Sequence, residues 1–89
     1  MSKTDKSVGK QATIPTAFVA GFPHDAILRV AAILKDGSEK YGADNWRSID
    51  RDDHLNHAIN HIFLYLNGDS TEDHLGNATC RLLFALETE

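Results

Sequence analysis

Apolar residues recur every three or four positions along three stretches of the chain, which is the spacing of one face of an α-helix. The pattern predicts helices over residues 23–41, 51–67 and 71–86. Their apolar faces, which we expect to pack together, are Ala26, Val30, Ile33, Leu34 and Tyr41; Leu55, Ala58, Ile59, Ile62, Phe63 and Leu66; and Leu75, Ala78, Leu82, Ala85 and Leu86. No stretch indicates a strand, so the sequence predicts an all-α fold, a small bundle of three main helices.

Residues at the ends of these stretches agree with the predicted boundaries. Pro23 suits a first helical turn, and Gly42 suits the position just after a helix because glycine readily takes a positive φ. Ser70 followed by Asp73 resembles a capping box, with Asp in place of Glu or Gln. This motif predicts that the third helix begins at Thr71.

The first residues differ in composition from the rest of the chain. Residues 1–14 are rich in Ser, Lys, Thr, Gly and Gln, so we expect a disordered N-terminal arm. Residues 15–89 then form a single all-α domain. A domain this small buries only about 60% of its unfolded surface, and Cys80 is the only cysteine, so no intrachain disulfide can stabilise it. We therefore expect a homodimer or homotetramer.

Charge and hydropathy exclude several classes of partner. The formal net charge is −4, from 9 basic and 13 acidic residues, which argues against a nucleic-acid binder. No apolar run approaches the roughly 18 residues of a membrane span, and no signal peptide is recognisable. A single cysteine fits a reducing compartment. The sequence thus predicts a cytoplasmic protein.

The second and third stretches each carry a polar stripe at helical spacing. The members of the two stripes are His54, His57 and His61, then His74, Asn77 and Arg81. Each stripe borders an apolar face, so an antiparallel helix pair would bring both stripes into one cleft. Two interpretations stay open: an ordinary solvated face, or a site in which His61 and His74 meet. The concentration of histidines favours the site.

The residue types leave the chemistry of a metal open. Clustered histidines suggest zinc, but no His-Glu-x-x-His motif occurs, and a lone cysteine excludes a thiolate-rich structural site. A mixed set of His, Asp and Asn could hold Mg²⁺ or Mn²⁺, although these ions prefer carboxylates.

Several blocks of the sequence together resemble one family. They are 38-SEKYGADNW-46, His61, 68-GD-69 and 73-DHLGNA-78. In combination they resemble the phage dATP/dGTP diphosphohydrolase N-terminal domain family, which is related to the MazG-like all-α nucleotide pyrophosphatases. The resemblance covers about residues 26–87. The chain departs from the family pattern at Asn60, where Arg is usual, and at Asn77, where His is usual.

The resemblance implies a MazG-like, often dimeric fold that cleaves a nucleoside triphosphate to monophosphate and pyrophosphate with Mg²⁺ or Mn²⁺. The carboxylate motifs of the wider superfamily fall on the two polar stripes, where this chain has few carboxylates. Glu39 and Asp73 are the metal ligands we expect. The expected catalytic residues are His57, His61, Asp73 and His74, and the expected substrate-binding residues are Lys40, Tyr41, Asn45, Trp46, Asn77 and Arg81.

Within this set, Arg81 or Lys40 would hold a phosphate. Trp46 or Tyr41 would stack on the base, and the alternative for Trp46 is a core anchor. The predicted function is therefore a metal-dependent pyrophosphohydrolase acting on a purine (d)NTP, located in the host cytosol if the gene is a phage gene. The alternative is a non-catalytic phage-type protein that sequesters a nucleotide or nucleotide-derived signal.

Overall fold

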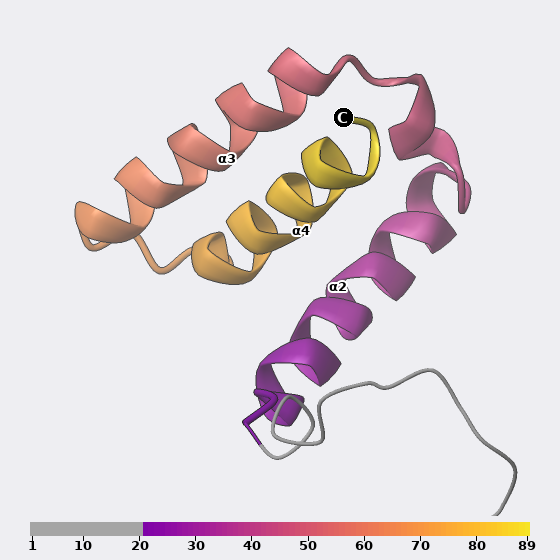
Figure 1. Cartoon of the computed structure of the whole chain (residues 1–89). Helices are drawn as coiled ribbons and strands as arrows, with labels where there is room; N and C mark the ends of the chain where they lie inside the picture. Colours follow the sequence, from indigo (N-terminus) through magenta and orange to yellow (C-terminus); the bar gives the residue numbers. More distant parts are fainter. Residues whose placement is uncertain (1–20) are drawn as a thin grey trace, which may run out of the picture.

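The computed structural model describes residues 21–89 as three α-helices and one short 3₁₀ helix (Figure 1). The elements are α2 (His24–Tyr41), η1 (Asn45–Ser48), α3 (Arg51–Leu66) and α4 (His74–Glu87). No strand occurs among these residues, which confirms the all-helical fold of three main helices. The predicted arm, residues 1–14, lies outside the described residues.

Helix α4 lies between the other two helices. Figure 1 shows α3 and α4 antiparallel and side by side, with α2 on the other side of α4. His74 and Arg81 of α4 contact histidines of α3, whereas Gly76 and Cys80 face α2. Two faces of α4 are therefore occupied within one chain.

The contact between α2 and α4 depends on a glycine. A Cβ atom at Gly76 would lie 2.5 Å from Cδ1 of Ile33 and 2.5 Å from Oδ2 of Asp73. One turn further along, Sγ of Cys80 lies 3.8 Å from the carbonyl oxygen of Val30. The absence of a side chain at Gly76 lets the two helices approach this closely.

Helix α4 begins at His74, later than the sequence pattern predicts. Asp69 accepts hydrogen bonds from the backbone N–H of Thr71 (3.0 Å) and from its hydroxyl (2.5 Å), and these bonds hold residues 69–71 in a turn. Asp73 is the N-cap, and its Oδ1 accepts the backbone N–H of Gly76 at 2.9 Å. The predicted capping box is therefore wrong, because Asp73 itself is the N-cap.

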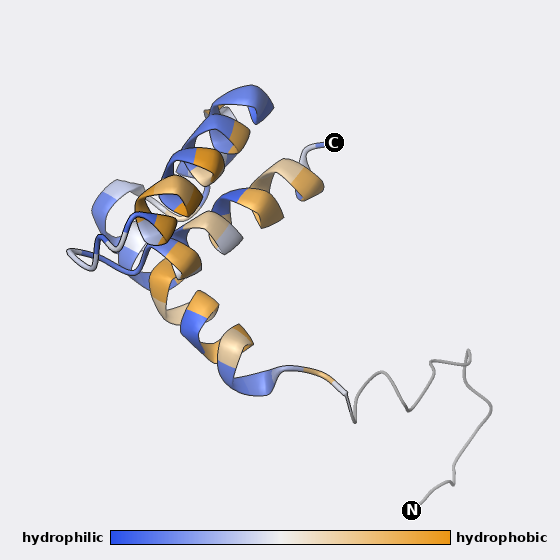
Figure 2. Ribbon diagram, turned by 90° about the vertical axis from the view of Figure 1, so that its left-hand side faces the viewer, coloured by the Kyte–Doolittle hydropathy of each residue, from blue (hydrophilic) through white to orange (hydrophobic). Residues whose placement is uncertain are grey.

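The buried core of the described chain is small. Its apolar members are Val30, Ala58, Ala78, Cys80 and Ala85. Many of the large residues on the predicted apolar faces are exposed instead: Leu34, Tyr41, Ile59, Phe63, Leu66, Leu75, Leu82 and Leu86. Figure 2 shows hydrophobic and hydrophilic residues following one another along the helices. The expectation that these faces pack together is thus wrong for these eight residues within a single chain, and the buried members of the faces are the smaller Val30, Ala58, Ala78 and Ala85.

None of the helices in residues 21–89 is long and apolar enough to cross a lipid bilayer.

Candidate functional site

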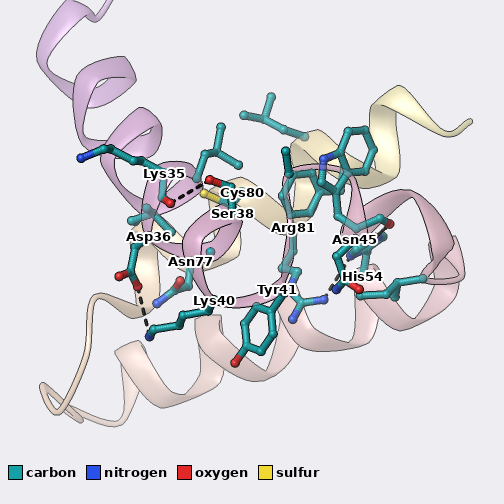
Figure 3. Close-up of a pocket in the computed structure, with 18 of the residues that line it drawn as sticks. Lys35, Asp36, Ser38, Lys40, Tyr41, Asn45, His54, Asn77, Cys80 and Arg81 are labelled. Atoms are coloured by element: carbon teal, nitrogen blue, oxygen red, sulfur yellow. Dashed lines mark hydrogen bonds and ion pairs between the residues drawn. The ribbon is translucent and has the colours of Figure 1, made fainter.

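An open pocket lies where the C-terminal half of α2, η1, α3 and α4 come together (Figure 3). Its volume is about 1120 Å³, which is ample for a nucleotide-sized ligand. All the expected substrate-binding residues line it: Lys40, Tyr41, Asn45, Trp46, Asn77 and Arg81. The structure therefore brings these six residues, from separate parts of the sequence, around one hollow.

A buried histidine fixes the position of Arg81. His54 is fully buried, and its Nε2 lies 2.9 Å from the carbonyl oxygen of Trp46. A carbonyl oxygen only accepts hydrogen bonds, so Nε2 carries the proton and donates it. The other ring nitrogen, Nδ1, is then a bare acceptor, and Nη1 of Arg81 donates to it at 3.1 Å. Figure 3 shows the guanidinium of Arg81 reaching from α4 toward His54.

The positive charge of Arg81 has no carboxylate partner within the described residues. Arg29, Arg47 and Arg51 each lie within ion-pair distance of an aspartate. Arg81 forms no such pair in residues 21–89, and its hydrogen bond goes to an uncharged imidazole. A half-buried guanidinium with free N–H groups facing a pocket is well suited to a phosphate.

The other pocket residues differ in how free they are to meet a ligand. Nζ of Lys40 lies 3.1 Å from Oδ2 of Asp36, so its charge is shared. Trp46 stacks on Phe84 with the ring centroids 4.6 Å apart, and the guanidinium of Arg47 lies 4.3 Å from the same Trp46 ring. One ring face cannot hold both neighbours, so both faces of Trp46 are covered.

Among the aromatic rings of the pocket lining, Tyr41 is exposed, whereas Trp46 and Phe84 are partly buried. Tyr41 lies at the end of α2, lines the pocket and is 70% exposed. We expected either Trp46 or Tyr41 to stack on a base, and the geometry favours Tyr41.

A chain of hydrogen bonds joins α3, α4 and the turn between them. Nδ1 of His61 lies 2.9 Å from Nδ1 of His74, which confirms the prediction that these two rings meet. Nε2 of His74 lies 2.8 Å from Oδ1 of Asp69. The carboxylate only accepts, so Nε2–H of His74 donates to Asp69. In a neutral His74 the bare Nδ1 then accepts the Nδ1–H of His61, and Nε2 of His61 keeps its lone pair.

The surroundings set the charge of both ends of this chain. Burial lowers the pKa of His61, with further lowering from His74 and Arg81, whereas Glu72 raises it. Hydrogen bonds from Thr71 and His74 lower the pKa of Asp69 to about 2. At neutral pH, His61 is therefore an uncharged imidazole and Asp69 a carboxylate.

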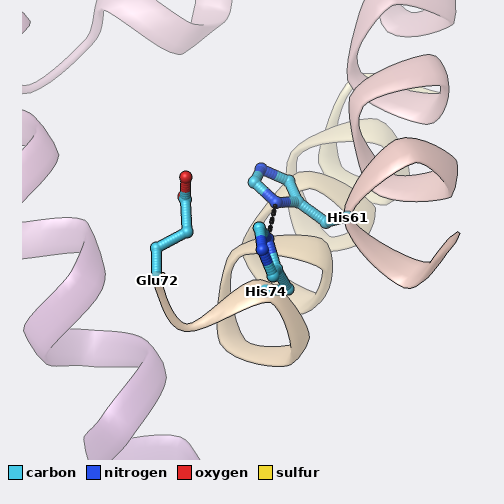
Figure 4. Close-up of side chains that lie close together, drawn as sticks. All are labelled: His61, Glu72 and His74. Carbon is cyan, nitrogen blue, oxygen red and sulfur yellow. Dashed lines mark hydrogen bonds between the residues drawn. The ribbon is translucent and has the colours of Figure 1, made fainter. Parts of the chain in front are cut away.

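Glu72 lies beside the two rings, as Figure 4 shows. One ligand atom from each of His61, Glu72 and His74 lies within 4.8 Å of the others. Glu72 and His61 line the pocket, while His74 is almost completely buried behind them. Two imidazoles and a carboxylate thus converge at the edge of the pocket.

Three of the expected site residues lie elsewhere. Glu39 is exposed, outside the pocket lining, with Oε2 3.7 Å from Nζ of Lys35. Asp73 caps α4 and receives Nε–H of Arg29 at 2.7 Å, and these bonds lower its pKa to about 2. His57 is exposed and does not line the pocket.

Sequence reasoning did not assign Asp69 or Glu72 to the site, and it gave His54 no separate role. Asp69 lies in the Gly-Asp turn that the family blocks include, so that block was a usable signal. Glu72 lies two positions before the start of α4, so helical periodicity cannot predict where its side chain lies. His54 belongs to the predicted stripe, but spacing alone does not reveal that it supports an arginine.

Comparison with known proteins identifies the family. The family described as dATP/dGTP diphosphohydrolase, N-terminal, matches residues 2–89. No curated protein and no solved structure matches the chain. The matched range contains the sequence blocks around Lys40–Trp46, His61 and His74–Ala78. The chain belongs to the dATP/dGTP diphosphohydrolase N-terminal domain family.

Proposed function

We propose that the protein is a nucleoside triphosphate pyrophosphohydrolase that cleaves a purine deoxynucleoside triphosphate to monophosphate and pyrophosphate. The observation that carries this proposal is Arg81, a guanidinium without a carboxylate partner among residues 21–89, held toward a pocket by neutral His54. The family name points to dATP and dGTP as the substrates. The pocket supports the same class of ligand, because it combines a cation, an exposed aromatic ring and amide side chains.

Each pocket residue has a role in this proposal. Arg81 binds a phosphate with its free N–H groups, and Lys40 adds a second, shared charge. Tyr41 stacks on the base, while Asn45 and Asn77 offer hydrogen bonds to base, sugar or phosphate. Because an enzyme of this kind gains most from positioning and charge stabilisation, Arg81 contributes more than Lys40, whose charge is shared with Asp36.

The proton acceptor in the proposal is His61. Its Nε2 carries a lone pair when Nδ1–H donates to His74, and burial keeps the ring uncharged at neutral pH by lowering its pKa. Asp69 holds the ring of His74, which in turn holds His61. An imidazole so placed can accept the proton of a water that attacks phosphorus.

The family chemistry implies a divalent ion, Mg²⁺ or Mn²⁺. The two ligands we expected, Glu39 and Asp73, do not fit one ion, because Asp73 is bonded to Arg29 and Gly76 and Glu39 lies outside the pocket. Mg²⁺ demands octahedral oxygen ligands and is commonly held by few carboxylates together with substrate phosphates. Glu39 and Asp73 therefore do not hold a Mg²⁺ ion together, and the nucleotide is the natural carrier of the ion.

The test is incubation of the purified chain with the common nucleoside and deoxynucleoside triphosphates, with Mg²⁺ or Mn²⁺, and separation of the products. We expect monophosphate and pyrophosphate from a purine deoxynucleotide. Release of orthophosphate instead would place the cleaved bond elsewhere and contradict the proposal.

Sequestration is the second candidate. Asn77 stands where the family pattern has a histidine, and the two expected carboxylate ligands are engaged in structural contacts. A chain that binds nucleotides tightly at the pocket and releases no pyrophosphate with either ion would be a nucleotide-binding protein without turnover.

A further inference from the structure

The cluster of His61, Glu72 and His74 at the pocket edge is built like a metal site of a different kind from the expected oxygen site. We propose that these three residues bind a borderline divalent transition ion of the Zn²⁺ or Co²⁺ type. Their ligand atoms lie within 4.8 Å of one another. This inference does not rest on nucleotide turnover, because it concerns binding of an ion by the protein alone.

The first support is the way His74 is held. A metal-binding histidine almost always donates its other ring N–H to a carboxylate or carbonyl, which fixes the tautomer and the ring plane. Nε2 of His74 donates to Oδ1 of Asp69 at 2.8 Å, and Thr71 donates to the same oxygen from its backbone N–H at 3.0 Å. Nδ1 of His74 therefore faces His61 as a bare ligand atom, on a side chain only 2% exposed.

The second support is the spacing of the two rings. Nδ1 of His61 and Nδ1 of His74 lie 2.9 Å apart, with one proton between them in the arrangement described. Two nitrogens on a tetrahedral Zn²⁺ lie about 3.3 Å apart, given Zn–N bonds of roughly 2.0–2.1 Å. An ion could replace the shared proton after the rings separate by a few tenths of an ångström. His74 is fixed by Asp69, so half-buried His61 is the ring that has room to move.

The third support is the chemical mix and the open side. Two imidazoles and one carboxylate suit zinc and neighbouring transition ions, whereas Mg²⁺ requires oxygen ligands. Glu72 is exposed, and its Oε1 accepts from Nδ2 of Asn77 at 3.2 Å, which leaves the other oxygen for an ion. Both Glu72 and His61 line the pocket. Three protein ligands with a fourth position open to a pocket are typical of a catalytic rather than a structural ion.

The experiment is titration of the untagged, metal-free full chain with Zn²⁺, Co²⁺ and Mg²⁺ in separate runs, without nucleotide. Calorimetry gives the affinity, and the visible absorption of Co²⁺ reports whether nitrogen ligands surround the ion. We expect saturable binding of Zn²⁺ and Co²⁺ and far weaker binding of Mg²⁺.

Variants identify the site. We expect Glu72→Gln, an exposed and conservative change, and His61→Ala each to weaken Zn²⁺ binding. Asp69→Asn should weaken it roughly ten- to hundredfold by releasing His74. His57→Ala is the matched control, because His57 is an exposed histidine of the same helix outside the cluster. Circular dichroism checks that each variant is helical.

The proposal is overturned if the wild-type chain binds neither Zn²⁺ nor Co²⁺, or if helical Glu72→Gln and His61→Ala both bind Zn²⁺ as tightly as His57→Ala. Either result would leave a proton as the only occupant between the two imidazoles. Failure here does not touch the pyrophosphohydrolase proposal, which is tested by nucleotide products, and loss of turnover does not affect the metal titration. An ion on Nδ1 of His61 would put the ring proton on Nε2, so the ion-bound chain is a different state from the one in which His61 accepts a proton.

Discussion

At the scale of single residues, Arg81 differs from the other arginines and is the one that we expect to bind an anion. Arg81→Ala removes a guanidinium whose free N–H groups face the pocket and which has no carboxylate partner among residues 21–89. We expect nucleotide affinity to fall by roughly ten- to a hundredfold, because a charge-assisted hydrogen bond contributes about 1.5–3 kcal/mol. Equilibrium binding of a radiolabelled or fluorescent purine deoxynucleotide measures the change.

The matched control is Arg51→Ala, which removes an exposed arginine at the start of α3 that lies near Asp52 and away from the pocket. Its nucleotide affinity should equal that of the wild-type chain. Equal losses in both variants would mean that the effect is one of overall charge, and the role given to Arg81 would be wrong.

A different experiment tests whether Tyr41 or Trp46 stacks on the base. Tyr41→Ala should weaken nucleotide binding by about 1–3 kcal/mol, the range for a base stacked on an aromatic ring, whereas Tyr41→Phe should keep the affinity. Trp46→Ala should instead lower the melting temperature, because Trp46 packs between Phe84 and Arg47. Wild-type affinity in Tyr41→Ala would exclude stacking on Tyr41.

The spacing of residues in the sequence predicted some of the side-chain contacts of the site. The contacts that it did not predict have physical explanations. His61 and His74 could be paired in advance because each borders the apolar face of its helix, and antiparallel helices bring such borders together. Asp73 was expected as a ligand because it lies beside the second stripe, and Glu39 because it directly precedes the block that begins at Lys40. Sequence position could not reveal that Arg29, from a helix remote in sequence, donates hydrogen bonds to both oxygens of Asp73.

At the scale of elements, Asp73 joins two helices as well as ending a turn. Asp73→Ala removes the N-cap of α4 and the ion pair with Arg29, so we expect the free energy of unfolding to fall by about 1–2 kcal/mol. Urea unfolding at pH 7, followed by circular dichroism, measures the loss. Asp73→Asn is the comparison, because asparagine can cap the helix but cannot form the ion pair.

The loss of stability in Asp73→Ala should depend on pH. The pKa of Asp73 is lowered from 3.8 to about 2 by Arg29 and Gly76, so the folded state favours the carboxylate. Its stabilisation is fully present above the unfolded pKa and is lost as the pH falls through the folded pKa. The stability difference between wild type and Asp73→Ala should therefore shrink between about pH 4 and pH 2. A difference that stays constant over that interval would contradict the assignment.

Gly76 tests the close approach of α2 and α4. Gly76→Ala puts a Cβ atom 2.5 Å from Cδ1 of Ile33 and from Oδ2 of Asp73, so one of these groups must move. Overpacking of this kind costs about 1–3 kcal/mol, although alanine is the better helix former. Gly37→Ala is the control, because a Cβ there meets nothing within 4 Å and the higher helix propensity should raise stability. Increased stability in both variants, measured by thermal unfolding, would show that the contact is not tight.

Helical periodicity predicted the elements closely, since α2 and α3 end within one or two residues of the expected positions. The start of α4 was predicted too early because Ser70 and Asp73 have the spacing of a capping box. Asp69 competes for that segment by binding both groups of Thr71, and the turn it forms excludes a helix there. Local side-chain hydrogen bonds of this sort are not visible in a hydrophobic pattern.

At the scale of the whole molecule, several of the exposed apolar residues face the same side of the α3–α4 pair. Ile59, Phe63 and Leu66 of α3, and Leu75 and Leu82 of α4, are exposed in the single chain. At about 100° per residue, each set lies on the same side of the antiparallel pair, turned away from the pocket side that carries His61 and Arg81. Patches of this kind mark interaction sites on small domains. The sequence predicted which residues are apolar but could not tell that they face outward, because Ala58, Ala78 and Ala85 fill the seam between α3 and α4.

We predict that this face joins copies of the chain into a dimer or tetramer, as the small core requires. Phe63, 64% exposed in one chain, would then be buried against a partner, so Phe63→Glu should shift the protein to monomer at micromolar concentration, where the wild type sediments as an oligomer. His57→Glu is the control, because His57 is exposed on the same helix but lies about 120° around the helix axis from Phe63. It adds the same charge and should leave the sedimentation coefficient unchanged.

If the wild-type chain sediments as a folded monomer, the apolar face serves another purpose. If Phe63→Glu stays oligomeric, the copies join through a different surface. Since the polar stripes lie on the opposite side, dissociation by Phe63→Glu should leave Zn²⁺ binding at His61 and His74 intact in any variant that remains helical.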